Sequence, residues 1–243
     1  NLLMKTIYYL FKREFLGYFR SPVAYVFLFV FAGASAVMAL NLGKMLETND
    51  ASMRTLFHYQ PWIFLVFIPA IGMRLWAEEK RSGTWELLFT LPITPIQAVL
   101  GKFLAAWIFV LVAICLTITM VLTIGYLGNP DWGPVLTGYF GLFLMAGSFM
   151  AVTSLTSAFT KNQVISFVIS TLVTLIFLFL GWSVFSGFLE GFLPMEIADA
   201  VAQFSFITHF EPFQNGVVSL KGLLYFLSFT VFCLFVNVIV LER

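Results

Sequence analysis

Hydrophobic residues fill long stretches of this chain that contain no charged side chain, and short polar segments separate these stretches. A helix rises about 1.5 Å per residue, so about 20 residues cross the roughly 30 Å hydrocarbon core of a membrane. Each stretch is long enough for one crossing and too short for two. The pattern predicts six transmembrane helices, at residues 22–43, 57–77, 95–126, 135–159, 163–187 and 222–241.

The composition indicates that lipid is the main solvent of the chain. Of its 243 residues, 60% are hydrophobic and 10% are charged, whereas soluble domains carry about 25% charged residues. The mean hydropathy is +0.97, and a soluble domain of this length has no core that could bury 30 phenylalanines. We therefore predict an all-α integral membrane protein with a single transmembrane domain over residues 1–243.

Charge and cysteine content argue against two other classes. The formal net charge is +1, which gives no basis for nucleic-acid binding. The only cysteines, Cys115 and Cys233, lie inside apolar runs. We interpret both as packing residues and predict neither a disulfide nor a metal site.

Positive charge is distributed unequally between the predicted loops. If the N-terminus is cytoplasmic and the chain crosses six times, ten of the 13 Lys and Arg residues lie on the cytoplasmic side. Cytoplasmic loops of membrane proteins carry an excess of Lys and Arg. We therefore expect a multi-pass protein with both termini in the cytoplasm.

Residues 4–20 are predicted to form a separate amphipathic helix in the inner membrane interface. At about 100° per residue, one face carries Ile7, Tyr8, Phe11, Phe15, Tyr18 and Phe19, and the other carries Lys5, Lys12, Arg13 and Arg20. A helix with this pattern lies along the membrane surface. Two interpretations stay open: an anchor that orients the first span, or a lever that contacts a cytoplasmic partner.

Local signals mark several helix starts and contacts. Ser21 precedes Pro22, and Thr94 precedes Pro95 with Gln97 at the capping-box position. The stripe Gly147, Ala151, Ser154 and Ala158 predicts close helix packing, with a substrate path as the alternative. Asn237, a buried amide, is expected to hydrogen-bond across helices.

The chain lacks the groups that would let it drive transport alone. No predicted span has an ionisable residue near its centre, where ion-coupled transporters place theirs. The sequence contains no nucleotide-binding loop of the form G-x-x-x-x-G-K-[ST] and no catalytic cluster. We predict that the chain is not an enzyme and binds no cofactor, so that the energy for transport comes from elsewhere.

Charge is concentrated in one loop, within "WAEEKRSGTWELLFTLPITP" at residues 76–95. The second span is expected to continue through Glu78 and Glu79, to break at 81–83, and to be followed by a short helix capped by Thr84. Trp85, Leu88 and Phe89 share one face of that helix. The pattern favours a docking element with an aromatic anchor, and a solvated charged turn is the alternative.

The segment 188–221 carries four acidic residues among many phenylalanines, with two prolines. It is too apolar for a solvated loop and too interrupted for a span. We predict short re-entrant helices at the outer side of the membrane, between spans 5 and 6.

The loop motif resembles the E-x-x-x-G-T-x-E-x-L-L-x-x-P signature of ABC-2 type permeases, the membrane subunits of ABC transporters. The resemblance rests on Glu79, Gly83, Thr84, Glu86, Leu87, Leu88 and Pro92, followed by Gly101 and Lys102; Leu87 stands one position before the first Leu of the signature, and Phe89 takes the place of the second. "FKREFLGYFRSP" and "HFEPFQNGVVSLKGLLYFL" extend the resemblance over essentially the whole chain. They are similar to the branch of gliding-motility and copper-processing (nitrous-oxide reductase maturation) permeases.

This resemblance implies that residues 78–92 form a coupling segment seated on a separate ABC ATPase subunit, which binds ATP and Mg. The implied interface comprises Glu78, Glu79, Lys80, Arg81, Gly83, Thr84, Trp85, Glu86, Leu87 and Leu88. Trp85 and Leu88 would fill the partner's groove, and Lys80 would be a solvated rim charge. The implied outer gate comprises Phe204, Phe206, His209, Phe210 and Phe213.

The resemblance also implies a location and an assembly. The expected location is the bacterial inner membrane, and the expected partners are a second permease chain (as a homodimer or heterodimer), membrane lipid and an accessory extracytoplasmic protein. The function is then export of an unidentified substrate. The alternatives are a mechanotransmitter that acts on an extracytoplasmic partner without transport, and an ATP-independent channel.

Overall fold

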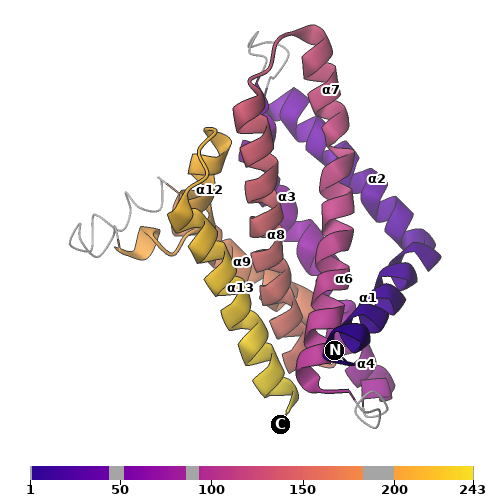
Figure 1. Ribbon diagram of the computed structural model, residues 1–243. Coiled ribbons are helices and arrows are strands. Elements are labelled where there is room, and N and C mark those ends of the chain that lie inside the picture. The colour runs from indigo at the N-terminus through magenta and orange to yellow at the C-terminus, as the bar shows by residue number, and fades with distance from the viewer. Residues whose placement is uncertain (1, 44–51, 86–92, 183–199, 243) are drawn as a thin grey trace.

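The computed structural model describes residues 2–43, 52–85, 93–182 and 200–242, and within them the chain forms helices and no strands. Figure 1 shows a bundle of long helices. The helices are α1 (Leu2–Arg20), α2 (Pro22–Val37) continued by the π-helical turn η1 (Met38–Leu42), α3 (Arg54–Gly72), α4 (Arg74–Ser82), α6 (Pro95–Leu116), α7 (Ile118–Leu127), α8 (Trp132–Phe159), α9 (Gln163–Phe179), α12 (Phe206–Gln214) and α13 (Leu220–Leu241).

Five helical stretches among the described residues are long and apolar enough to cross a membrane. They are Pro22–Leu42, Arg54–Ser82, Pro95–Leu127, Trp132–Phe159 and Leu220–Leu241. The predicted span at 163–187 overlaps α9, an apolar helix of 17 residues that ends at Phe179, and the last five residues of the predicted span lie outside the described residues. A membrane protein with several spans is therefore confirmed, and the count of six stays a prediction.

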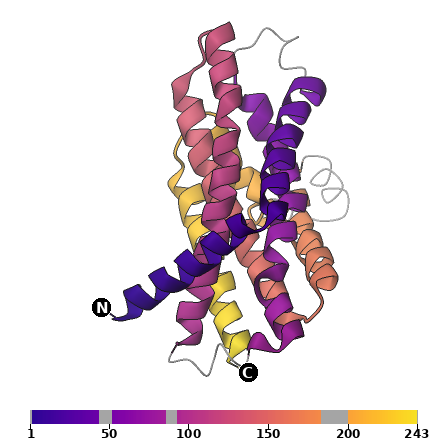
Figure 2. The same ribbon diagram turned by 90° about the vertical axis from the view of Figure 1, so that its right-hand side faces the viewer.

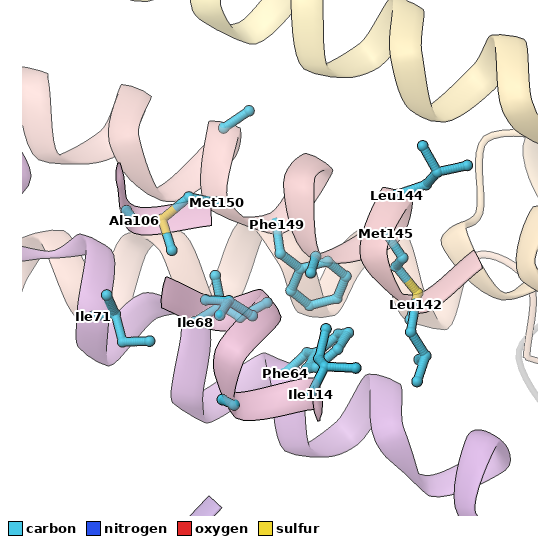
Figure 3. Packing of buried hydrophobic residues seen from close by; sticks show 14 of the residues in the cluster. Phe64, Ile68, Ile71, Ala106, Ile114, Leu142, Leu144, Met145, Phe149 and Met150 are labelled. Atoms are coloured by element: carbon cyan, nitrogen blue, oxygen red, sulfur yellow. The ribbon is translucent and has the colours of Figure 1, made fainter. Parts of the chain in front are cut away.

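Helix α8 occupies the centre of the bundle and packs against α3, α6, α9, α12 and α13. In its most apolar window 72% of the residues are buried, against 28% for the helices at Pro22–Leu42 and Leu220–Leu241. Figure 3 shows side chains of α3, α6 and α8 meeting in the core, among them Phe64, Ile68 and Phe149. The two peripheral helices thus leave most of their apolar surface for lipid or for another chain.

The predicted packing stripe of α8 lies in this core. Gly147, Ala151, Ser154 and Ala158 are all buried. A Cβ added at Gly147 would lie 2.8 Å from Trp107, so only glycine allows α6 to approach this closely. The close packing predicted for the stripe is confirmed.

The predicted helix starts are also confirmed. Ser21 accepts a hydrogen bond from the amide of Val23, and Thr94 and Gln97 form the reciprocal capping box. Each of these bonds satisfies an amide at a helix start that has no partner within the helix.

Helix α1 crosses α6 obliquely, as Figure 2 shows. Leu10 is the most buried of its apolar residues, and a Cβ added at Gly101 of α6 would lie 2.8 Å from the Leu10 Cβ. The Tyr18 and Phe109 rings stack at 4.8 Å between centroids. Tyr8, which the periodicity placed on the apolar face, is 57% exposed. The apolar face of α1 therefore packs on α6, and its location in the membrane interface stays a prediction.

Candidate functional site

The regular helix is interrupted at Met73, where α3 ends and α4 begins. The Ser157 hydroxyl of α8 accepts hydrogen bonds from the amides of Trp76 and Ala77, both at 3.0 Å, and donates one to the Met73 carbonyl at 2.9 Å. A serine hydroxyl has one donor and two acceptor sites, and all three are used here. One side chain of the central helix thus holds the break in the α3–α4 backbone.

Hydrogen bonds also link Trp76 of α4, through Ser154 of α8, to α13. Its ring is fully buried, and its Nε1 donates to Ser154 Oγ at 3.3 Å. The Asn237 amide donates to the same hydroxyl at 2.7 Å. The predicted hydrogen bond of Asn237 across helices is confirmed, and it joins α4, α8 and α13 through one serine.

Lys102 of α6 is 3% exposed, and its Nζ lies 2.7 Å from Glu79 Oε1 and 3.6 Å from Glu14 Oε1. The ammonium also lies 5.3 Å from the centroid of the Trp76 ring. A buried ammonium needs such partners because removing it from water costs on the order of several kcal/mol. These charged side chains therefore connect α1, α4 and α6.

The pKa of the Glu14 carboxyl is shifted by its surroundings. Burial raises the pKa of its carboxyl, but the positive charge of Lys102 and the hydrogen bond from Arg13 outweigh that effect, so the pKa is lowered overall. Glu14 is therefore a carboxylate at neutral pH, and the charge attraction to Lys102 is present.

We call these seven residues the α4 junction: Glu14, Trp76, Glu79, Lys102, Ser154, Ser157 and Asn237. They come from α1, α4, α6, α8 and α13. Figure 1 shows α4 and both termini toward one end of the bundle, and α12 beside the other half of α8. Helix α4 is bonded directly to α6 and α8, and through Lys102 and Ser154 it is linked to α1 and α13.

Helix α4 ends at Gly83, which adopts φ 74°, in the left-handed region. This conformation is costly for other residues and common at helix C-caps. Thr84 and Trp85 resume helical conformation, and Thr84 Oγ1 lies 2.8 Å from Ser82 Oγ. The break predicted at residues 81–83 is therefore present at Gly83. The capping bond predicted for Thr84 would reach amides outside the described residues.

The predicted coupling residues differ in their environment. Glu78, Arg81, Gly83 and Thr84 are exposed, Glu79, Lys80 and Trp85 are half-buried, and Glu86, Leu87 and Leu88 lie outside the described residues.

Lys80 requires a correction. Its ammonium donates to the Ala158 carbonyl and lies 5.0 Å from the centroid of the Trp85 ring. It is therefore an internal contact between α4, α8 and Trp85, and the expectation of a solvated rim charge is wrong. Its long aliphatic chain allows the ammonium to reach back to the C-terminal turn of α8, which its place in a charged loop does not reveal.

The predicted gate residues lie on and next to α12. Phe206, Phe210 and Phe213 are each 0% exposed. The Phe206 ring has Phe149, Phe177 and Phe229 as neighbours, at centroid distances of 5.0, 5.4 and 5.2 Å respectively. Cβ atoms added at Gly141 or Gly222 would each lie 2.7 Å from Phe213 atoms. We call Phe206, Phe210 and Phe213, together with the neighbouring rings of Phe149, Phe177 and Phe229, the α12 packing site.

Two gate candidates differ from the other three. Phe204 is 61% exposed, so its expected burial is wrong within the described chain. It precedes the helix, and its carbonyl accepts a hydrogen bond from the Tyr225 hydroxyl at 2.5 Å. His209 is half-buried and stacks on Tyr225 at 4.0 Å between ring centroids, with Nε2 2.8 Å from the Gln203 carbonyl. The described segment contains a short packed helix, and a re-entrant path through the membrane stays a prediction.

The family of ABC-2 family transporter proteins matches residues 26–241. The chain belongs to the ABC-2 transporter family. It is accordingly a multi-pass membrane protein of an ABC transporter, and membership implies partnership with an ABC ATPase subunit. No curated protein matches the chain.

Sequence reasoning missed most of the α4 junction of this ABC-2 protein. Ser157 carries no motif and Glu14 lies in the family-like stretch without a predicted role, and their partners are 84 and 88 positions away in the chain (157 − 73 and 102 − 14). Lys102 offered one usable signal, because it is a lone cation in a helix that is otherwise apolar except near its start. Such a residue requires a buried carboxylate partner.

Proposed function

We propose that this chain is the membrane-spanning permease subunit of an ABC exporter of the gliding-motility and copper-processing branch. Residues 78–92 would dock on a separate ATPase subunit that binds ATP and Mg, and a second permease chain would complete the transport path in the bacterial inner membrane. Segment 188–221 would act as the outer gate. The observation that carries the proposal is the α4 junction, because it links the loop next to Gly83 to four other helices.

The mechanism follows from differential binding. ATP draws the two ATPase subunits together, and the coupling segments move with them. Because α4 is hydrogen-bonded to α8 and ion-paired to α6, this movement shifts the bundle between two conformations. ATP biases that equilibrium only as far as the complex binds it differently in the two conformations.

The test is Trp85→Ala in the complex with its ATPase. Truncation of a buried aromatic anchor typically costs about 2 kcal/mol or more, roughly a thirtyfold loss of affinity. We expect loss of ATPase co-purification and of ATPase stimulation at matched expression. Trp132→Ala is the control, because Trp132 is 57% exposed at the start of α8. Wild-type binding and stimulation by Trp85→Ala would contradict the docking assignment.

Two further assays separate the alternatives. Transport of labelled cargo by the reconstituted complex distinguishes an exporter from a mechanotransmitter, which would stimulate the ATPase equally but move no cargo. Flux through liposomes that hold this chain alone would indicate an ATP-independent channel.

A further inference from the structure

A cavity of about 490 Å³ lies between α1, α2, α3, α4 and α6, beside the α4 junction. Sites for small ligands generally have volumes of about 300–1,000 Å³. Its walls include Gly17 of α1, Phe27 of α2, Ile71 of α3 and Phe109 of α6. The cavity is therefore large enough for the polar head of a lipid and the first part of its chains.

The lining changes from polar to apolar along the bundle axis. Glu14, Arg74, Glu78, Glu79 and Lys102 line the part next to α4. Along α6, Phe109 follows Lys102 by seven residues, about 10 Å of helix, and Phe27 of α2 and Ala70 and Ile71 of α3 add apolar lining. A phospholipid has the same order: a charged head followed by apolar chains.

The charges define the kind of headgroup. Three carboxylates and two cations line the cavity, and Lys102 is already used by Glu79 and Glu14. Glu79 Oε2 is buried and accepts no hydrogen bond within the described chain. The polar end thus offers spare acceptors for a cationic donor. Arg74, which is exposed and forms no ion pair with the described residues, offers a partner for a phosphate.

We propose that this cavity binds a phospholipid whose headgroup ends in a primary ammonium, as in phosphatidylethanolamine. The ammonium donates its hydrogen bonds to the carboxylates of Glu78 and Glu79, the phosphate pairs with Arg74, and the chains run along Phe27 and Phe109. A trimethylated ammonium has no N–H to donate, and a glycerol headgroup has no positive charge. The site therefore selects among membrane lipids by headgroup, independently of whether an ATPase is bound.

Two glycines provide a matched pair of variants. A Cβ added at Gly17 meets no atom within 4 Å, and the same is true at Gly33. Gly17 lines the cavity and Gly33 does not. Both lie inside helices, so replacement by Leu raises helix propensity equally at both positions. Gly17→Leu fills the cavity, and Gly33→Leu leaves it open.

The experiment uses the full chain, purified in detergent and freed of lipid, in native mass spectrometry. It is titrated with phosphatidylethanolamine, phosphatidylcholine and phosphatidylglycerol that carry identical acyl chains. We expect one saturable phosphatidylethanolamine adduct, with at least about tenfold weaker binding of the other two lipids. Gly17→Leu should abolish the adduct, and Gly33→Leu should keep it.

Glu78→Gln tests the headgroup without breaking the Lys102 ion pairs. It should reduce phosphatidylethanolamine binding to the level of phosphatidylcholine, even if Gly17→Leu proves unstable. Equal binding of the three lipids would overturn the headgroup assignment, since it indicates an acyl-chain groove alone. Undiminished binding by a folded Gly17→Leu variant would overturn the location.

Discussion

The α4 junction and the α12 packing site connect the bundle in opposite ways. The α4 junction uses directional hydrogen bonds and ion pairs between named side chains and backbone amides. The α12 packing site uses aromatic rings around Phe206, with no charged group among them. Hydrogen bonds and ion pairs fix the orientation and register of one helix against another, whereas contacts between rings depend mainly on the shape and volume of the side chains.

This difference teaches which changes each region tolerates. At the α12 packing site a smaller apolar side chain loses contacts in proportion to the volume removed. At the α4 junction the loss of one atom leaves its partner buried without a bond. The first region should therefore respond gradually to substitution, and the second abruptly.

The largest effect is expected for Phe206→Ala, which creates a cavity among at least three rings. We expect the free energy of unfolding to fall by about 3–5 kcal/mol, with Phe206→Leu much milder because it refills most of the volume. Unfolding titrations in mixed micelles measure both. Phe204→Ala is the control, because Phe204 is 61% exposed. Equal losses for Phe206→Leu and Phe206→Ala would contradict a volume-dependent response.

Lys102→Met should come next, with a loss of about 3 kcal/mol, the lower part of the range for breaking a buried ion pair. We place it there because Glu79 and Glu14 are 21% and 24% exposed and keep some contact with solvent. Combining Lys102→Met with Glu79→Gln should recover part of the loss, since it removes the orphaned charge. Additive losses in this double-mutant cycle would show that the two residues are not coupled.

Ser157→Ala should cost about 2 kcal/mol. It removes one oxygen and leaves the amides of Trp76 and Ala77 without the acceptor that they use, and an orphaned buried group costs about 1–3 kcal/mol. Ser157→Thr keeps the hydroxyl and is the matched variant. Hydrogen exchange at Trp76 and Ala77 is the direct readout, and unchanged protection in Ser157→Ala would contradict the proposed role of the hydroxyl.

The sequence predicted the α12 packing site better than the α4 junction. Burial of Phe206, Phe210 and Phe213 follows from a segment too apolar to be solvated, and only Phe204 differs, because it lies before the helix. Apolar periodicity reports which face is buried, and that information is local in the chain. The helix caps at Ser21 and Thr94 were predictable because their signals are also local. For Asn237 only the need for a bond was predictable, and its partner Ser154 lies 83 positions away.

The α4 junction could not be predicted because its specificity lies in pairings between distant segments. Lys80 and Lys102 are both cations near the same loop, yet one reaches the Ala158 carbonyl and the other Glu79. Which partner each finds depends on how α4 packs against α6 and α8. Neither composition nor spacing contains that arrangement, so Lys80 was wrongly predicted to be solvated.

The smallest effect on stability is expected at Gly83, which also gives the sharpest comparison between the α4 junction and the α12 packing site. A Cβ added there meets no atom within 4 Å, so the cost of Gly83→Ala arises only from φ 74°. That cost is about 1 kcal/mol, and Gly83→Asn should lose less because asparagine tolerates the left-handed region. Unfolding titrations compare the two variants, and equal stability of wild type and Gly83→Ala would show that Gly83 does not keep the left-handed conformation.

If α4 passes movement from the coupling segment, however, ATPase stimulation should fall more in Gly83→Ala than in Phe206→Leu at matched assembly. The reason is that the turn sets the direction of the segment beyond it, whereas Phe206 affects only how tightly α12 packs.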